Sequence, residues 1–190
     1  METLQDQAKN LKKELRAKMK VLKNSVPMQE RIRLSDLIME KVEQLEEFSK
    51  ATTILLYYSL PDEVQTAAFL EKWAVCKTDN CSAKRLVLPV VDGEDLILKE
   101  YKPGMLESGY QNILEPTNTT IINPSEIDFA LVPGVAFDLN NNRLGRGKGF
   151  YDRLLPALSC PVFGLAYPFQ IVEQVPTESF DKKLDGLVTL

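Results

Sequence analysis

The clearest chemical pattern in the sequence is a short glycine-rich segment in its second half. Residues 143–152 read RLGRGKGFYD, in which three glycines alternate with Arg146 and Lys148. Glycine tolerates positive φ and lets the backbone approach a bound group closely, and the free amides of such a loop attract anions. Because the two side chains add full positive charges, the segment predicts a phosphate-binding loop.

A carboxylate, Asp152, follows this loop. It would repel a polyphosphate unless a cation lay between them, so we interpret Asp152 as a ligand of Mg²⁺, directly or through water. Such a site would suit a nucleoside triphosphate. The familiar nucleotide motifs do not fit. A P-loop needs glycine in place of Asn142 and serine or threonine in place of Gly149. A dinucleotide fingerprint that starts at Gly145 needs glycine in place of Phe150.

Two other interpretations of the loop stay open at this stage. One is a surface loop with solvated charges, and the other is an RNA-binding loop in which Phe150 and Tyr151 supply the stacking. The chain has a formal net charge of −4, which argues against a general nucleic-acid binder, so any anion site has to be local.

Composition also limits the chemistry. The 190 residues include no histidine, which argues against a zinc site and against a Ser-His-Asp arrangement. The cysteines Cys76, Cys81 and Cys160 are odd in number and lack CxxC spacing, so we expect buried thiols rather than a disulfide framework. There is no apolar run long enough to cross a bilayer and no secretory signal pattern. We therefore expect a cytoplasmic protein with no membrane partner.

Helical and strand patterns alternate along the chain, whose length suits a single domain over residues 1–190. Helices are predicted over residues 4–22, 34–48, 63–76 and 150–158, and strands over 53–60, 85–91, 96–101, 128–132, 161–167 and 184–190. Residues 102–124 are predicted as a loop with one short element. The alternation predicts an α/β fold, a three-layer α/β/α domain with a mainly parallel sheet. Ligands collect beyond the carboxyl ends of such strands, where the glycine-rich segment would lie.

The glycine-rich segment also carries a family resemblance. Residues 131–155, LVPGVAFDLNNNRLGRGKGFYDRLL, resemble the signature of the 5-formyltetrahydrofolate cyclo-ligases. The resemblance extends over nearly the whole chain. It includes Lys-x-x-Leu-Arg at residues 12–16, YYSLPDEVQT at 57–66, ILEP at 113–116 and SFDKKLD at 179–185.

The resemblance implies a fold similar to that of sugar-phosphate isomerases and CoA transferases, and an ATP-dependent ring closure. In that reaction 5-formyltetrahydrofolate and MgATP give 5,10-methenyltetrahydrofolate, ADP and phosphate. The formyl oxygen attacks the γ-phosphoryl group, and N10 then closes the ring as phosphate leaves. Phosphoryl transfer depends mostly on positioning and charge neutralisation, so the absence of histidine is no obstacle.

The resemblance also implies roles for individual residues. Those expected to bind ATP are Lys12, Lys13, Glu14, Leu15, Arg16, Arg143, Leu144, Gly145, Arg146, Gly147, Lys148, Gly149, Phe150 and Tyr151. Those expected to bind the folate are Arg16, Tyr58, Glu63, Arg146, Gly147, Lys148, Gly149 and Phe150. Arg146 and Lys148 are expected to stabilise the transferred phosphoryl group, and Asp152 and Asp181 to hold Mg²⁺.

The sequence departs from the family pattern at two places. Phe180 replaces a histidine that is common before the C-terminal aspartate, so Asp185 is an alternative to Asp181. Phe150 replaces a common tyrosine. Two other functions stay open: an enzyme that activates a different formamide-like substrate, and a silent module that binds folate or phosphoanions. We expect small-molecule substrates, no nucleic-acid partner, and a monomer or weak homodimer.

Overall fold

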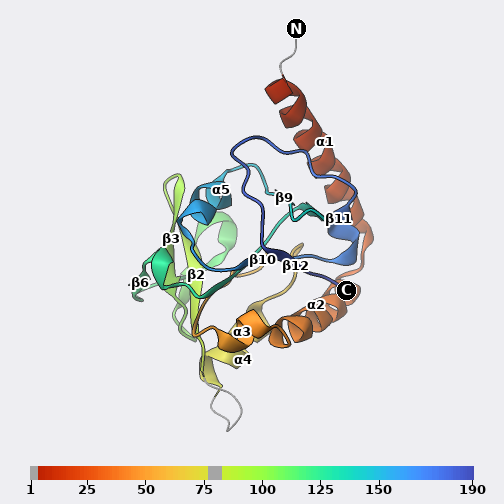
Figure 1. Cartoon of the computed structure of the whole chain (residues 1–190). Coiled ribbons are helices and arrows are strands. Elements are labelled where there is room, and N and C mark those ends of the chain that lie inside the picture. The colour runs from red at the N-terminus through yellow and green to blue at the C-terminus, as the bar shows by residue number, and fades with distance from the viewer. Residues whose placement is uncertain (1–3, 77–82) are drawn as a thin grey trace.

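The computed structural model describes residues 4–76 and 83–190, and a seven-stranded sheet lies at its centre (Figure 1). The strand order is β12-β10-β7-β1-β2-β3-β6. These strands are β1 (Thr53–Leu55), β2 (Arg85–Asp92), β3 (Asp95–Glu100), β6 (Ile121–Ile122), β7 (Phe129–Val132), β10 (Val162–Leu165) and β12 (Gly186–Val188). The neighbouring pairs from β12 to β2 are parallel, whereas the pairs β2-β3 and β3-β6 at one edge are antiparallel. The predicted mainly parallel sheet is therefore confirmed.

The central strands are buried on both faces, which explains why they are continuous apolar runs in the sequence. Along β7, Phe129 and Leu131 face one apolar cluster, while Ala130 and Val132 face another. This is the two-residue period of a strand.

Helices cover the two faces unequally. The first cluster contains side chains of α2 (Met28–Glu43), α3 (Glu46–Lys50) and α4 (Ala67–Val75). The second contains side chains of the short α5 (Phe150–Leu154) and of the 3-10 helix η3 (Leu155–Ala157). The sheet is thus a middle layer between helices, as predicted.

The first helix, α1 (Leu4–Ser25), packs on a second, smaller sheet. That sheet has the order β11-β8-β9, made of β11 (Ile171–Val172), β8 (Ala136–Asp138) and β9 (Arg143–Leu144). Met19 of α1 is fully buried in a third cluster, against Ala136 of β8 and Leu144 of β9. Figure 1 shows α1 beside β9 and β11. This packing brings one side of α1 next to the glycine-rich segment.

Several predicted boundaries were wrong. The strand predicted over residues 53–60 ends at Leu55, and residues 102–124 hold more structure than one short element. They contain β4 (Leu106–Ser108), η1 (Tyr110–Asn112), β5 (Leu114–Pro116) and β6. The remaining 3-10 helices are η2 (Pro124–Glu126) and η4 (Pro168–Gln170).

The cysteine prediction was only partly right. Cys160 is a free, half-buried cysteine, and burial raises the pKa of its thiol to about 11. Cys76 is disulfide-bonded, contrary to expectation, and Cys81 lies outside the described residues. None of the described helices combines the length and the apolar character that crossing a bilayer would require.

Candidate active site

A cavity of about 380 Å³ lies beyond the carboxyl ends of two neighbouring parallel strands, β1 and β7. Tyr57 and Tyr58 follow β1 and line it, as do Pro133 and Gly134 after β7. This is where ligands collect in open α/β sheets. The sequence-predicted residues that line it are Lys12, Arg16, Tyr58, Glu63, Arg143, Leu144, Gly145, Arg146, Gly147, Lys148, Gly149, Phe150, Tyr151, Asp152 and Asp181.

The glycine-rich loop depends on glycine at two of its three glycine positions. Gly147 and Gly149 have φ values of 97° and 72°, which side-chain-bearing residues rarely adopt. Gly145 is not among the residues with positive φ. Its carbonyl instead accepts a hydrogen bond of 2.8 Å from Nε of Arg16 on α1. The loop is therefore attached to the first helix.

A buried carboxylate, Asp138, organises the turn that leads into the loop. It accepts hydrogen bonds from the backbone amides of Asn140, Asn142 and Val175, and from the side-chain amide of Asn142. Burial opposes ionisation here, but the hydrogen bonds outweigh it, so the pKa of Asp138 lies below its ordinary value. The asparagine run is thus part of the scaffold of the loop.

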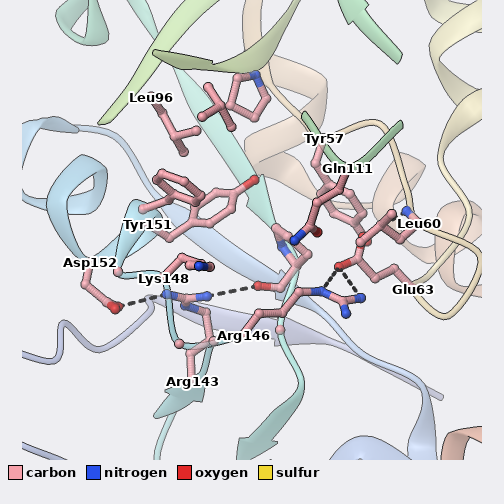
Figure 2. A pocket seen from close by; sticks show the side chains of 18 of the residues that line it. Tyr57, Leu60, Glu63, Leu96, Gln111, Arg143, Arg146, Lys148, Tyr151 and Asp152 are labelled. Atoms are coloured by element: carbon pink, nitrogen blue, oxygen red, sulfur yellow. Dashed lines mark hydrogen bonds and ion pairs between the residues drawn. The ribbon is translucent and has the colours of Figure 1, made fainter. Parts of the chain in front are cut away.

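Arg143 and Asp152 fasten the two ends of the loop together. An Arg143 guanidinium nitrogen lies 2.9 Å from Oδ1 of Asp152, and the other guanidinium nitrogen donates to the carbonyl of Pro133 (Figure 2). Only 4% of the Arg143 side chain is exposed. The guanidinium also lies over the ring of Tyr151, with its carbon 5.2 Å from the ring centroid. Arg143 therefore holds the loop and faces the cavity with little freedom to move.

Arg146 points across the cavity to two carboxylates. Its Nε and one terminal nitrogen lie 3.1 and 3.0 Å from Oε1 of Glu63 (Figure 2). That same nitrogen lies 2.5 Å from Oδ1 of Asp62. Lys23 of α1, which is almost fully buried, lies 3.3 Å from the other oxygen of Asp62. Burial lowers the pKa of Lys23. Burial also opposes ionisation of Asp62, but the positive charges of Lys23 and Arg146 outweigh it and hold the pKa of Asp62 below its ordinary value. Two cations and two anions thus neutralise one another.

Lys12 forms a second charge cluster with the C-terminal segment. Its Nζ lies 2.8 Å from Glu178 and 2.5 Å from Asp181, and all three side chains are largely buried. The other carboxylate oxygen of Glu178, Oε1, is buried without a hydrogen-bond partner among the described residues. Burial lowers the pKa of Arg16, one turn further along α1, against the effect of nearby carboxylates. The two cations thus lie at the junction of α1, the glycine-rich loop and the C-terminal segment.

Comparison with known proteins assigns the chain to a family. A model of the 5-formyltetrahydrofolate cyclo-ligase family matches residues 8–190. The chain belongs to this family. The 5-formyltetrahydrofolate cyclo-ligase of Haemophilus influenzae is 36% identical over 145 residues, which cover 71% of this chain and 74% of that protein. The Mus musculus protein of the same name is 26% identical over 191 residues, 93% of this chain and 92% of that protein.

Solved structures agree with the family assignment. The NMR structure of the Aquifex aeolicus 5,10-methenyltetrahydrofolate synthetase has a TM-score of 0.82 and 38% identity, covering 94% of this chain and 89% of that chain. The Mycoplasma pneumoniae 5,10-methenyltetrahydrofolate synthetase has a TM-score of 0.72 and 28% identity, covering 93% and 97%. The predicted α/β architecture is thus shared with these two synthetase structures.

Some predicted residues of the cyclo-ligase site lie outside the cavity. Lys13 and Glu14 are exposed, and Leu15 packs against the cluster around Met19. They follow Lys12 in sequence, but helical geometry turns them to other faces of α1. Asp185, the alternative metal ligand, does not line the cavity either. Its carboxylate accepts a hydrogen bond from the backbone amide of Val162 at the start of β10.

Other cavity residues of this family member were missed by sequence reasoning. They are Tyr57, Leu60, Pro89, Val91, Leu96, Tyr110, Gln111, Ile113, Glu115, Pro133 and Gly134. The ionic partners Asp62 and Glu178 were missed as well. Asp62 directly precedes the predicted Glu63 in the sequence, and this neighbour could have indicated that Asp62 lies near the site. Glu178 offered none, because its role depends on where residue 12 lies.

Proposed function

We propose that this cavity binds 5-formyltetrahydrofolate and ATP together and catalyses their conversion into 5,10-methenyltetrahydrofolate, ADP and phosphate. The observation that carries the proposal is the composition of the cavity wall. A cationic loop and the cations of α1 meet Glu63 and apolar residues in a single space. Such a wall suits a triphosphate at one end and a flat, polar-edged ring system at the other.

The nucleotide is proposed to bind at the junction of α1 and the glycine-rich loop. Arg16 and Lys148 supply positive charge there, and the positive φ of Gly147 and Gly149 shapes the backbone around the phosphates. Lys148 is exposed, and its side chain forms no hydrogen bond or ion pair with the described residues. Its charge is therefore available to a ligand.

The folate is proposed to bind between Glu63 and the opposite apolar wall. Glu63 is buried, and its Oε2 already accepts a hydrogen bond from the backbone amide of Leu60. A fixed carboxylate can accept hydrogen bonds from the amino and ring N–H groups of a pterin. Tyr58 and Leu96 line the same cavity, and their apolar surfaces can pack against the ring.

The chemistry that this placement supports is phosphorylation followed by ring closure. The formyl oxygen attacks the γ-phosphorus as the bond to ADP breaks, and this gives a phosphorylated iminium. N10 then bonds to the former formyl carbon, the C–O bond breaks, and the departing phosphate carries away the oxygen and takes up the N10 proton. Arg146 and Lys148 are proposed to stabilise negative charge on the transferred group.

Asp152 and Asp181 are proposed to hold Mg²⁺ together with the phosphates. Each binds a cation of the chain through one oxygen, and the other oxygen forms no hydrogen bond with the described residues. Among the described residues, no cluster of three acidic or other ligating side chains could hold a metal by itself. That set fits Mg²⁺, which prefers one or two carboxylates plus substrate phosphates and water. When bound, Mg²⁺ would neutralise phosphate charge.

An absorbance assay tests the proposed function. The protein is mixed with 5-formyltetrahydrofolate, ATP and Mg²⁺, and the near-ultraviolet absorption of the methenyl product is followed. We expect product only in the complete mixture, with one ADP formed per product. ADP formation without a methenyl product would favour a different formamide-like substrate. Binding of both ligands without any turnover would favour a silent binding module. A cytoplasmic location, a single domain over residues 1–190, and a monomer or weak homodimer stay predictions.

A further inference from the structure

Arg146 occupies hydrogen-bonding sites that the proposed folate needs. An ionised carboxylate offers about four lone-pair positions, two on each oxygen. On Glu63, Oε1 accepts two hydrogen bonds from Arg146, and Oε2 accepts one from Leu60. A pterin that pairs through its amino group and adjacent ring N–H needs one free position on each oxygen. Only Oε2 has one, so this mode of binding requires Arg146 to withdraw from Glu63.

A second carboxylate, Asp62, also holds Arg146. Asp62 already accepts a hydrogen bond of 2.5 Å from the terminal nitrogen that contacts Glu63. Asp62 itself is held by Lys23, whose side chain is 3% exposed and therefore has little freedom. The side chain of Arg146, in contrast, is 41% exposed. Arg146 is thus the most exposed member of the cluster and the one with the most freedom to move.

We infer that Asp62 is a positioning residue that holds Arg146 away from the phosphates until folate displaces its guanidinium from Glu63. The inference rests on the proposed function. Before folate binds, three hydrogen bonds to two carboxylates retain Arg146. After folate binds, only the contact with Asp62 remains, and a triphosphate competes with it more easily. Folate therefore tightens nucleotide binding, and by linkage nucleotide tightens folate binding by the same factor.

Binding measurements on the full-length chain test this coupling. Isothermal titration calorimetry gives the dissociation constant of a non-hydrolysable ATP analogue with Mg²⁺, with and without saturating 5-formyltetrahydrofolate. In the unmodified protein we expect folate to tighten analogue binding by roughly 5- to 150-fold, the usual range of such couplings. In Asp62→Asn, only the two hydrogen bonds to Glu63 retain Arg146, so analogue binding without folate becomes tighter. With folate bound, the triphosphate already outcompetes Asp62 for Arg146, so the affinity changes little there and the coupling factor falls at least about threefold.

Variants of Lys23 separate this effect from simple loss of stability. Asp62→Asn leaves Lys23 buried without its partner, so the double variant Lys23→Met, Asp62→Asn removes both charges. We expect the double variant to show the same reduced coupling. Lys23→Met alone keeps Asp62 beside Arg146, and its coupling should equal or exceed that of the unmodified protein. Reduced coupling in Lys23→Met would overturn the inference, because the effect would then follow from a disturbed cluster.

Product formation distinguishes this inference from the proposed function. If the unmodified protein makes the methenyl product but folate does not alter analogue affinity, the function stands and the inference fails. The inference also fails if Asp62→Asn retains the full coupling factor. If neither folate binding nor product is detected, the proposed function itself fails.

Discussion

Arg143 and Asp152 lie nine residues apart and form an ion pair of 2.9 Å that joins the strand before the glycine-rich loop to the helix after it. The pair is asymmetric, because the Arg143 side chain is 4% exposed and that of Asp152 is 31% exposed. One partner is therefore part of the scaffold, while the other can still reach a ligand. This relationship explains how the loop can be both firmly held and open to substrate.

Removal of the buried partner should weaken both the fold and nucleotide binding. Arg143→Met removes the ion pair with Asp152 and the contact with Tyr151. We expect the free energy of unfolding to fall by about 2 kcal/mol. This loss is smaller than the usual cost of breaking a fully buried ion pair, because Asp152 is partly solvated. The KM for ATP should rise roughly tenfold, as one or more loop contacts are lost. Denaturant unfolding and steady-state kinetics measure these changes. Arg33→Met, which breaks an exposed pair with Glu30, is the control and should change neither quantity.

Lys148 should matter for turnover and not for stability. Lys148→Ala removes a charge that faces the proposed phosphates but supports no apolar core, so we expect kcat to fall by roughly 10²- to 10³-fold. The melting temperature without ligand should not change. Lys18→Ala, which removes an exposed lysine of α1 outside the cavity, should leave kcat as it is. A steep loss of thermal stability in Lys148→Ala would show that the lysine is structural.

The positive φ of Gly147 should be required for function beyond its effect on stability. Alanine at this position is strained, at about 1 kcal/mol, and its Cβ would lie 3.4 Å from the guanidinium of Arg16. Gly93→Ala is a matched control, because Gly93 also has positive φ but would place its Cβ in open space. We expect similar losses of stability in both variants, and weaker ATP-analogue binding only in Gly147→Ala. Equal binding by the two variants would rule out a specific role for the loop backbone.

Asp138 should make the stability of the protein sensitive to acid. Its pKa lies below the ordinary value of 3.8, so its stabilising contribution is present above that value and is lost as the pH falls through the lower, folded-state pKa. We expect Asp138→Asn to lose about 3 kcal/mol at pH 7. The difference from the unmodified protein should shrink below about pH 4. Unfolding curves at several pH values provide the measurement, with exposed Asp36→Asn as the control; a difference independent of pH would contradict the assignment.

Local patterns predicted the sheet and the loop well, because both depend on neighbouring residues. The apolar run at Phe129–Val132 became a buried central strand, and two of the three glycines of the loop have the predicted positive φ. Lys13 illustrates the limit of this reasoning. It neighbours Lys12 in a motif, yet it lies on another face of α1 and is exposed.

Contacts between distant segments could not be predicted in the same way. No local pattern indicates that Glu178 meets Lys12, because that contact depends on how α1 packs against the small sheet. The irregular appearance of residues 102–124 was also misleading. Short strands such as Leu106–Ser108 and Leu114–Pro116 are stabilised by pairing with each other, and three-residue runs carry too little periodicity to be recognised.

The meeting of Lys12 with Asp181 also bears on how the protein matures in the cell. The two residues are separated by 169 positions, and contacts of such separation form late because a long stretch of chain must first be ordered. A partly folded chain in which Glu178 and Asp181 have not yet reached Lys12 cannot complete this end of the cavity. Removal of residues 178–181 should therefore leave Lys12 without its partners and loosen the contact between α1 and this segment.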